Sequence, residues 1–213
     1  MKKLKTIQNT VTIEIEEKRS KFIANIYNVD NVENAENIIK QIKKKYYDAR
    51  HNCYAYIIND KQMIKKSSDD GEPSGTAGSP ILNVIEKNEL CNILIVVTRY
   101  FGGILLGTGG LVRAYTEAAT NAIKNSIIVE EEEGYEIEIT ISYQDMSKLK
   151  YYCNRNNINM IKTEYGENIK CIIEVTSEEK ENILDNYKFD EKMAKIIKFD
   201  TLRKKYIRKP KDK

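Results

Sequence analysis

The chain has 213 residues, of which 35 are Lys or Arg and 32 are Asp or Glu. The resulting net charge of +3 is too small to indicate a nucleic-acid partner, which would need local clustering of basic residues. The apolar share of 41% is enough for a hydrophobic core and excludes general disorder. This length suits one large domain or two smaller ones.

Cysteine and histidine usage argues against a zinc site. The four cysteines form no C-x-x-C pair, and the chain has a single histidine. We therefore expect four reduced, mostly buried thiols. No apolar run approaches the ~18 residues of a membrane span, and the first ten residues lack the apolar core of a signal peptide. The sequence predicts a cytoplasmic protein with no membrane partner.

Two alternating stretches open the chain, around residues 11–15 and 22–26, and predict a β-hairpin. Asp30 can cap a helix, and Glu33 stands where it would complete a capping box. Apolar residues then recur on one helical face as far as Tyr46. A further strand is expected over residues 51–60.

The segment 67–119 is the most distinctive part of the chain. Eight of the ten glycines lie between Gly71 and Gly110. They form two loops on either side of an apolar run, 93–98, which predicts a central strand covered on both faces. Ser79 and Pro80 suit the start of a helix that runs to about residue 90, and a second helix is expected over residues 111–126.

Glycine clustering indicates positive φ angles or close backbone approach. The best candidates are Gly75, Gly78, Gly103, Gly107 and Gly109.

The sequence EEEEG at 130–134 is a break in composition and predicts a domain boundary, with domains at 1–133 and 134–213. Beyond it the patterns predict strand, helix, two strands, helix and a last strand near 195–199. This βαββαβ order is that of a ferredoxin-like domain. The expected fold class is α+β.

The second glycine loop, FGGILLGTGG, lies between a predicted strand and a predicted helix, where backbone N–H groups can bind an anion. Arg99 and Arg113 would add charge if they face the loop. The candidate anion or nucleic-acid contacts here are Arg99, Gly102, Gly103, Gly107, Thr108, Gly109, Gly110 and Arg113. The alternative is that these glycines serve only close helix–strand packing.

Nucleotide motifs fail in this loop. Thr108 occupies the lysine position of a P-loop, and Val112 stands where the dinucleotide fingerprint has its third glycine. We therefore expect no ATP or NAD cofactor.

The first glycine loop carries Asp69, Asp70, Glu72 and Ser74, with His51 shortly before it. Three carboxylates can hold a divalent cation, but their spacing is not that of an EF-hand. Ser74 lacks a nucleophile motif. These five residues are weak catalytic candidates, and a structural role in a tight turn is favoured over metal binding.

The chain ends in TLRKKYIRKPKDK. Two interpretations stay open for its cations, Arg203, Lys204, Lys205, Arg208 and Lys209. They belong either to a solvated tail or to an arm that contacts phosphates.

Four stretches resemble the IMPACT/YigZ family: RSKFIA at 19–24, DARHNCYAY at 48–56, DDGEPSGTAGSPIL at 69–82 and VTRYFGGILLGTGGLVRAYTEAA at 97–119. The resemblance implies an N-terminal domain similar to a domain of a small-subunit ribosomal protein. It also implies a C-terminal domain similar to the last domain of elongation factor G. In the eukaryotic branch, IMPACT restrains a kinase that controls translation initiation by competing for the kinase's activator protein. For the bacterial branch, the resemblance implies nucleic-acid or ribosome association and brings no reaction with it.

Three functions are therefore considered. The first is a non-enzymatic, translation-associated protein that binds RNA, the ribosome or another polyanion. The second is an enzyme, such as a hydrolase, that uses the acidic loop. The third is a protein-interaction module with a protein partner.

Overall fold

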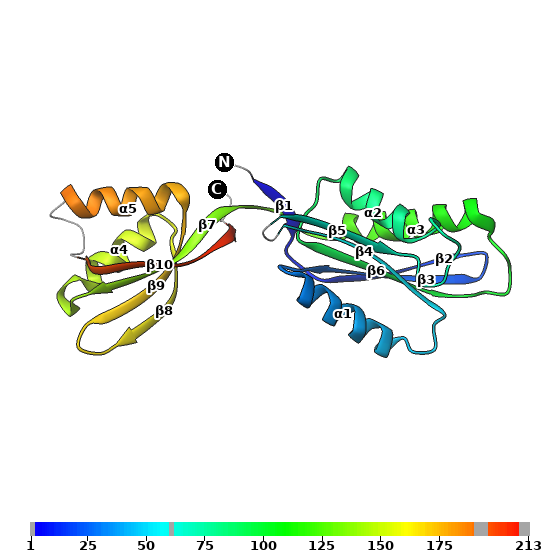
Figure 1. Ribbon diagram of the computed structural model, residues 1–213, viewed down its shortest axis with the longest axis horizontal. Helices are drawn as coiled ribbons and strands as arrows, with labels where there is room; N and C mark the ends of the chain where they lie inside the picture. The colour runs from blue at the N-terminus through cyan, green and yellow to red at the C-terminus, as the bar shows by residue number, and fades with distance from the viewer. Residues whose placement is uncertain (1–2, 60–61, 190–195, 209–213) are drawn as a thin grey trace. The chain divides into compact units, whose positions relative to one another are not determined.

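The computed structural model describes residues 3–59, 62–189 and 196–208. The chain divides into two compact units, an N-terminal unit, Lys5–Val129, and a C-terminal unit formed by Glu130–Lys213 together with Met1–Leu4. Both units are mixed α and β, which agrees with the expected α+β class (Figure 1). No helix in the described ranges is long and apolar enough to cross a membrane.

The N-terminal unit is built on a five-stranded antiparallel sheet. The strand order is β2 (Val11–Glu17), β3 (Ser20–Asn28), β6 (Ile93–Tyr100), β4 (His51–Asn59), β5 (Met63–Ser68). The apolar run 93–98 thus forms the central strand, as predicted, and residues 93–99 are all buried.

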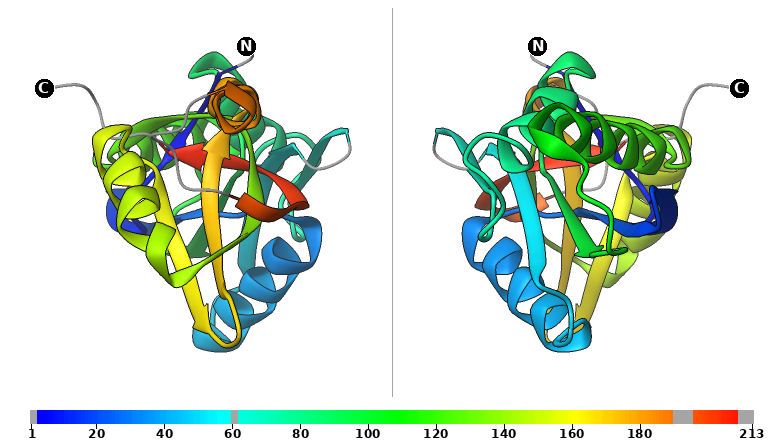
Figure 2. Two further views of the ribbon diagram at one scale, coloured as in Figure 1. Left: turned by 90° about the vertical axis from the view of Figure 1, so that its left-hand side faces the viewer. Right: turned by 90° about the vertical axis from the view of Figure 1, so that its right-hand side faces the viewer.

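Helices cover both faces of this sheet. Figures 1 and 2 show α1 (Val32–Lys45) on one face, with α2 (Gly78–Lys87) and α3 (Gly107–Lys124) on the other. Ile39 and Ile42 of α1 pack against Tyr56 and Leu94 of the sheet. On the opposite face, the rings of Phe22 and Tyr115 meet edge-on with centroids 5.1 Å apart, a geometry that aromatic pairs favour.

Two short strands were missed in the sequence, β1 (Leu4–Ile7) and β5. β5 reads MIKKSS and lies at the sheet edge, where its side chains are exposed or half-buried. Lysines are common on edge strands because they discourage pairing with other chains. The hydrophobic alternation that identifies a half-buried strand is therefore absent.

Both predicted helix caps were wrong by a residue or two. Asn31, not Asp30, caps α1, and its side-chain oxygen accepts a 2.8 Å hydrogen bond from the Asn34 amide. α2 begins at Gly78, before Ser79, and its N-cap residue Ala77 has no side-chain cap.

The C-terminal unit has the ferredoxin-like βαββαβ order. Its elements are β7 (Ile128–Ile141), the 3-10 turn η1 (Tyr143–Asp145), α4 (Met146–Arg155), β8 (Asn159–Tyr165), β9 (Ile169–Thr176), α5 (Ser177–Phe189) and β10 (Ile196–Arg208). The strands lie in the order β8-β9-β7-β10, each antiparallel to its neighbour, and β1 also pairs with β7.

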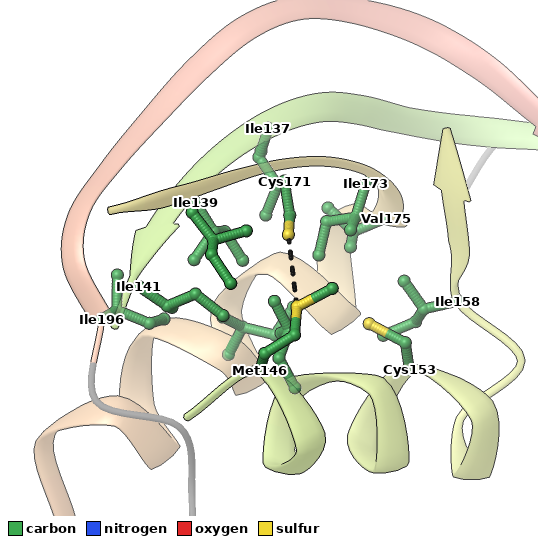
Figure 3. Close-up of a cluster of buried hydrophobic side chains, with 13 residues drawn as sticks. Ile137, Ile139, Ile141, Met146, Cys153, Ile158, Cys171, Ile173, Val175 and Ile196 are labelled. Carbon is green, nitrogen blue, oxygen red and sulfur yellow. Dashed lines mark hydrogen bonds between the residues drawn. The ribbon is translucent and has the colours of Figure 1, made fainter. Parts of the chain in front are cut away.

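Figure 3 shows the core of this unit, in which isoleucines of β7 and β9 face Met146 and Cys153 of α4. The thiol of Cys171 lies 3.9 Å from the Met146 sulfur. All four cysteines are free and buried, as expected.

The acidic stretch 130–134 lies inside β7, and the division between the units falls at Val129 and Glu130 within that strand. The composition break is therefore not a linker. A Cβ on Gly134 would meet Val175 O at 2.5 Å and Ile207 Cδ1 at 2.2 Å, so β9 and β10 pack closely around this glycine.

The basic segment, for which a solvated tail and a phosphate-contacting arm were the two open interpretations, is part of a strand as far as Arg208. β10 continues to Arg208, well past the predicted end at Phe199. Lys195 and Lys209, together with the side chain of Arg208, lie outside the described residues.

Gly102 allows two loops to approach each other closely. An added Cβ would lie 2.0 Å from the Arg19 carbonyl carbon and 2.4 Å from the Ser20 nitrogen. These are backbone atoms, which cannot rotate out of the way as a side chain can, so residue 102 must be a glycine for the two loops to approach this closely.

The glycine predictions have mixed outcomes. Gly75, Gly103 and Gly107 have positive φ, and Gly78 lies against the Ser68 backbone, as expected. Gly109 has neither feature and was predicted wrongly, whereas the requirement at Gly102 was missed.

We expect Gly102→Ala to lower the free energy of unfolding by about 1–3 kcal/mol, because a methyl group there overlaps backbone atoms. Gly109→Ala is the matched control. Its Cβ would meet nothing closer than an Arg113 nitrogen at 3.8 Å, so it should be neutral or stabilising by up to about 1 kcal/mol. Denaturant titration of both variants measures the difference. Equal stabilities would contradict the close approach at Gly102.

Candidate functional site

The first glycine loop folds around the side chain of Asp69. Its Oδ1 accepts hydrogen bonds from the amides of Ala77 at 3.0 Å and Gly78 at 2.8 Å, and its Oδ2 accepts one from Gly75 at 2.8 Å. Asp69 therefore caps α2 from eight residues before the N-cap residue. Burial raises the pKa of this carboxyl, but the three N–H bonds outweigh that effect and hold the pKa below its usual value.

Asp70 ties the same loop to α1 and β4. Its carboxylate pairs with Lys43 and accepts a 2.7 Å bond from the Asn52 amide. Its carbonyl oxygen lies 3.0 Å from Nδ1 of His51. A carbonyl can only accept, so this contact is a hydrogen bond when the proton is on Nδ1. His51 therefore acts as a scaffold for the turn.

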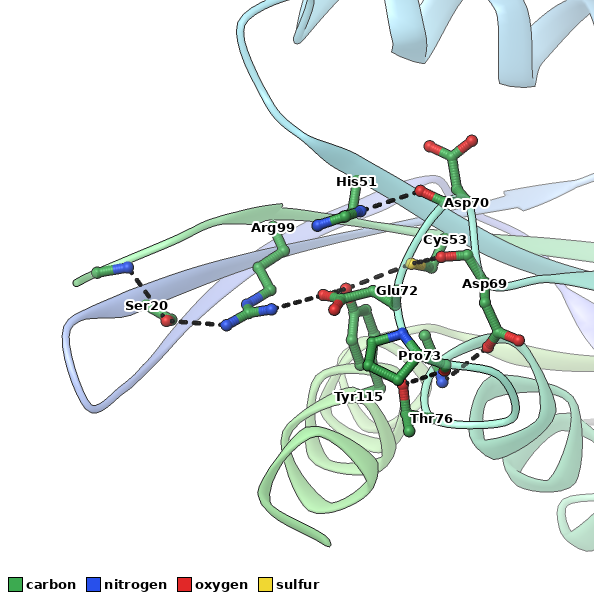
Figure 4. A network of polar contacts seen from close by, with 12 residues as sticks. Ser20, His51, Cys53, Asp69, Asp70, Glu72, Pro73, Thr76, Arg99 and Tyr115 are labelled. Carbon is green, nitrogen blue, oxygen red and sulfur yellow. Dashed lines mark hydrogen bonds and ion pairs between the residues drawn. The ribbon is translucent and has the colours of Figure 1, made fainter. Parts of the chain in front are cut away.

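Glu72 and Arg99 form a buried ion pair. The two side chains are only 3% and 8% exposed, and Arg99 Nη1 donates to Glu72 Oε1 over 2.7 Å. The Tyr115 hydroxyl donates to the same oxygen over 2.8 Å. Figure 4 shows this arrangement, in which β6, α3 and the first glycine loop each contribute one residue.

Arg99 also joins the two glycine loops. Its Nη2 lies 3.5 Å from Ser20 Oγ, which in turn accepts a 3.2 Å bond from the Gly102 amide. The guanidinium carbon lies 5.6 Å from the ring centroid of Phe22 and 5.6 Å from that of Phe101. The buried Nε has no hydrogen-bond partner among the described residues. Arg99 is thus held by the core, and the sequence-based expectation that it faces an anion is not met.

Cys53 extends the network. Its thiol donates to the Asp69 carbonyl at 3.0 Å and lies 3.3 Å from the Tyr115 hydroxyl. Burial, aided by nearby carboxylates, raises the pKa of this thiol to about 12. Burial also raises the pKa of Tyr115. Both groups stay protonated at neutral pH, and the thiolate is the reactive form of cysteine.

The three acidic residues are thus engaged separately: Asp69 with amides, Asp70 with Lys43, and Glu72 with Arg99. Ser74 is exposed, and no hydrogen bond in the described part of the chain links it to a base. Within the described ranges, no group of three metal-binding side chains comes together. The contacts of these carboxylates are those of residues that hold a tight turn in place.

Of the two arginines expected to add charge to the second glycine loop, Arg99 is buried against Glu72 and only Arg113 is exposed. α3 begins at Gly107, where Thr108 and Gly109 are exposed and the N-cap residue Leu106 makes no side-chain cap. Arg113 is exposed, and it forms no ion pair with any described residue. Phe101, Ile104 and Leu105 of this loop are 47%, 41% and 84% exposed.

The C-terminal cations Arg203, Lys204 and Lys205 are paired. Arg203 makes two 2.7 Å bonds to the Glu136 carboxylate, Lys204 pairs with Glu133, and Lys205 pairs with Glu136 and Glu174. The Arg203 hydrogen bond is the main cause that holds the pKa of Glu136 below its usual value. The charges of these three cations are therefore locally balanced.

The structure reveals a cationic surface that the sequence reasoning missed, here called the basic end. It lies at the end of the sheet where β4 begins and β6 ends. These two strand ends are neighbours, since His51 pairs with Arg99 in the sheet register. It consists of exposed Lys18 and Arg19 in the β2–β3 turn, Lys44 and Lys45 at the end of α1, Arg50 just before β4, and Arg113 on α3. The run KKKYYDAR at 43–50 was the available signal, since basic residues interleaved with aromatics are typical of nucleic-acid contacts.

Comparison with known proteins places these features in a family. Residues 18–123 match the Impact N-terminal domain, and residues 139–185 match a domain of unknown function (DUF1949). The IMPACT family member YvyE of Bacillus subtilis is 37% identical over 83% of this chain and 80% of its own length. YigZ of Escherichia coli is 34% identical over 73% of this chain and 77% of its own.

A solved structure described as that of a hypothetical protein aligns with 92% of this chain and 97% of its own. Its TM-score is 0.65 and its sequence identity 28%. These matches define a two-domain protein with an Impact-type N-terminal domain. The chain belongs to the IMPACT family.

We expect Asp69→Asn to lower the free energy of unfolding at pH 7 by about 1–3 kcal/mol, because an amide NH₂ would face a backbone N–H donor. The folded-state pKa of Asp69 is depressed, so its contribution is fully present above the unfolded pKa. It disappears as pH falls through the folded pKa, and the two proteins should then converge. Urea titrations from pH 7 to pH 3 test this. A pH-independent difference would contradict the capping role.

Arg99→Met should cost about 3–5 kcal/mol of stability, because it leaves the Glu72 carboxylate buried without its cation. The double variant Arg99→Met, Glu72→Gln removes both charges and should recover part of that loss. A double-mutant cycle of denaturant midpoints measures the coupling. A coupling energy near zero would show that the pair is not the buried contact described above.

Proposed function

We propose that this chain is a non-enzymatic, translation-associated protein that binds RNA, as free strands or on the ribosome, through the basic end of its N-terminal unit. The observation that carries the proposal is the convergence, at one end of one sheet, of cations from separate chain segments that form no ion pair with a described residue. Sequence-independent binding of nucleic acid rests mainly on such contacts with phosphates.

Topology brings these segments together. Gly102 follows β6 and lies against Arg19 of the β2–β3 turn. Arg50 leads into β4, which pairs with β6 on its other side. α3 leaves the same loop, and a Cβ on Gly109 in its first turn would lie 3.8 Å from an Arg113 guanidinium nitrogen. None of the six cations of the basic end forms an ion pair with a described residue.

The surplus of positive charge is small. The same segments carry the carboxylates of Glu16, Glu17, Asp48 and Glu117, all of them exposed. The Asp48 carboxylate is already bonded to the Tyr100 hydroxyl at 2.7 Å. We therefore expect weak binding that depends strongly on salt. The amides at the start of α3 add a modest attraction for phosphate.

The proposed link to translation rests on family membership, since the resemblance implies ribosome association for the bacterial branch. A catalytic role has less support, because Asp69, Asp70 and Glu72 hold the fold together and the Cys53 thiol is protonated.

A protein partner is the second candidate. Phe101, Ile104 and Leu105 are exposed in one short loop, and clustered apolar residues on a surface favour protein contacts. Such a partner would bind this loop at salt concentrations that abolish RNA binding.

The salt dependence of RNA binding tests the first candidate. Binding to a labelled single strand should weaken linearly on a log–log plot against salt. The double variant Arg19→Gln, Arg113→Gln should make the slope shallower by roughly 0.7 for each phosphate that no longer meets a cation. Arg155→Gln is the matched control, an exposed arginine at the end of α4 in the other unit. Arg203→Gln should also leave the slope unchanged, because Glu136 already neutralises that charge.

Absence of binding at low ionic strength would remove the RNA function. Equal slope changes in the double variant and in Arg155→Gln would remove the basic end as its site.

A further inference from the structure

We propose that the basic end selects single-stranded RNA, with unpaired bases stacked on the rings of Phe101 and Tyr47. This inference rests on the proposed RNA binding and adds the class of RNA that is bound. Stacking on aromatic rings requires bases that are free of a duplex, and it is tolerant of sequence.

Tyr47 is the more exposed of the two rings. Its side chain is 85% accessible, and it lies in the turn between α1 and β4. Lys44, Lys45 and Arg50 surround it in sequence and supply cations for a strand's phosphates. A tyrosine exposed to this extent contributes little to the core, so its ring is free to take a base.

Phe101 is held in place by the buried network. The Arg99 guanidinium lies 5.6 Å from its centroid, and Arg99 is itself fixed by Glu72 and Ser20. The ring is 47% exposed, which agrees with one covered face and one open face. A ring fixed in this way loses little conformational entropy when a base stacks on it.

One hydrogen bond links the segments that carry the two rings. The Tyr100 hydroxyl donates to Asp48 Oδ1 over 2.7 Å. Tyr47 precedes Asp48 and Phe101 follows Tyr100, so the rings lie on adjoining segments at the basic end. Their cationic neighbours are Arg50 on one side and Arg19, beside Gly102, on the other. The combination of cations that track the backbone with aromatic rings is that of single-strand binding sites.

On the open face of the C-terminal sheet, described charged side chains are engaged in ion pairs. Some βαββαβ domains bind RNA by stacking bases on the open sheet face. Here that face carries the ion pairs of Glu136 with Arg203 and of Glu138 with Lys170. The charges of Arg203 and Lys170 are therefore already neutralised and add little attraction for a strand's phosphates.

The experiment compares one mixed-sequence RNA of about 20 nucleotides, long enough to span one such site, as a single strand and annealed to its complement. The wild-type protein should bind the single strand more tightly. Tyr47→Leu and Phe101→Leu should each weaken single-strand binding by about fivefold or more. Duplex affinity and the salt slope should stay unchanged, because both variants keep every cation that meets a phosphate.

Tyr151→Leu is the matched control, since Tyr151 is 68% exposed on α4 of the other unit. It should behave as the wild type. Thermal melts identify any variant whose fold has changed, and Tyr47→Leu decides the outcome if Phe101→Leu unfolds.

Salt-dependent binding with equal affinity for single strand and duplex, and no loss in Tyr47→Leu, would overturn the stacking inference and leave the proposed function intact. Binding of neither RNA would overturn both.

Discussion

The buried pair of Arg99 and Glu72 is the contact on which the N-terminal unit depends most. Arg99 comes from the central strand and Glu72 from the first glycine loop. The Tyr115 hydroxyl, which donates to the same Glu72 oxygen, comes from α3. Arg99 also reaches Ser20, which holds the Gly102 amide. Replacing one partner of such a pair leaves an uncompensated charge in the interior, which is far more costly than losing an exposed pair. The two family-defining loops therefore depend on the same few atoms.

Elements with a local pattern were predictable from the sequence. The β2–β3 hairpin, α1 and the central strand β6 follow from alternation or helical spacing, which depend on neighbours along the chain. β5 and the second half of β10 were missed because their exposed lysines and arginines hide the strand pattern. The contacts of the candidate site were harder to predict from the sequence. That Asp69 caps α2, and that Arg99 meets Glu72 instead of an anion, depends on sheet register and loop closure. Residue spacing does not encode these contacts.

Charge is distributed differently in the two units. In the C-terminal unit, Arg203 and Lys205 share the Glu136 carboxylate across neighbouring strands. In the N-terminal unit, Arg50 and Arg113 have no such partner among the described residues. A near-neutral total can therefore coexist with one cationic surface, and the sequence-wide sum of +3 conceals it. Position along a sheet, and not the count of charges, determines where a polyanion is attracted.

The buried cysteines give the chain a built-in chemical reporter. Cys53 and Cys91 belong to the N-terminal unit, and Cys153 and Cys171 to the C-terminal unit. Burial raises the pKa of Cys53 and of Cys153 to about 12, so these two thiols offer alkylating reagents almost no thiolate while their units are folded. Modification then requires that a unit opens, and the site of labelling identifies which one. The opening of each unit can be followed separately in the native chain, without introducing a dye or a tag.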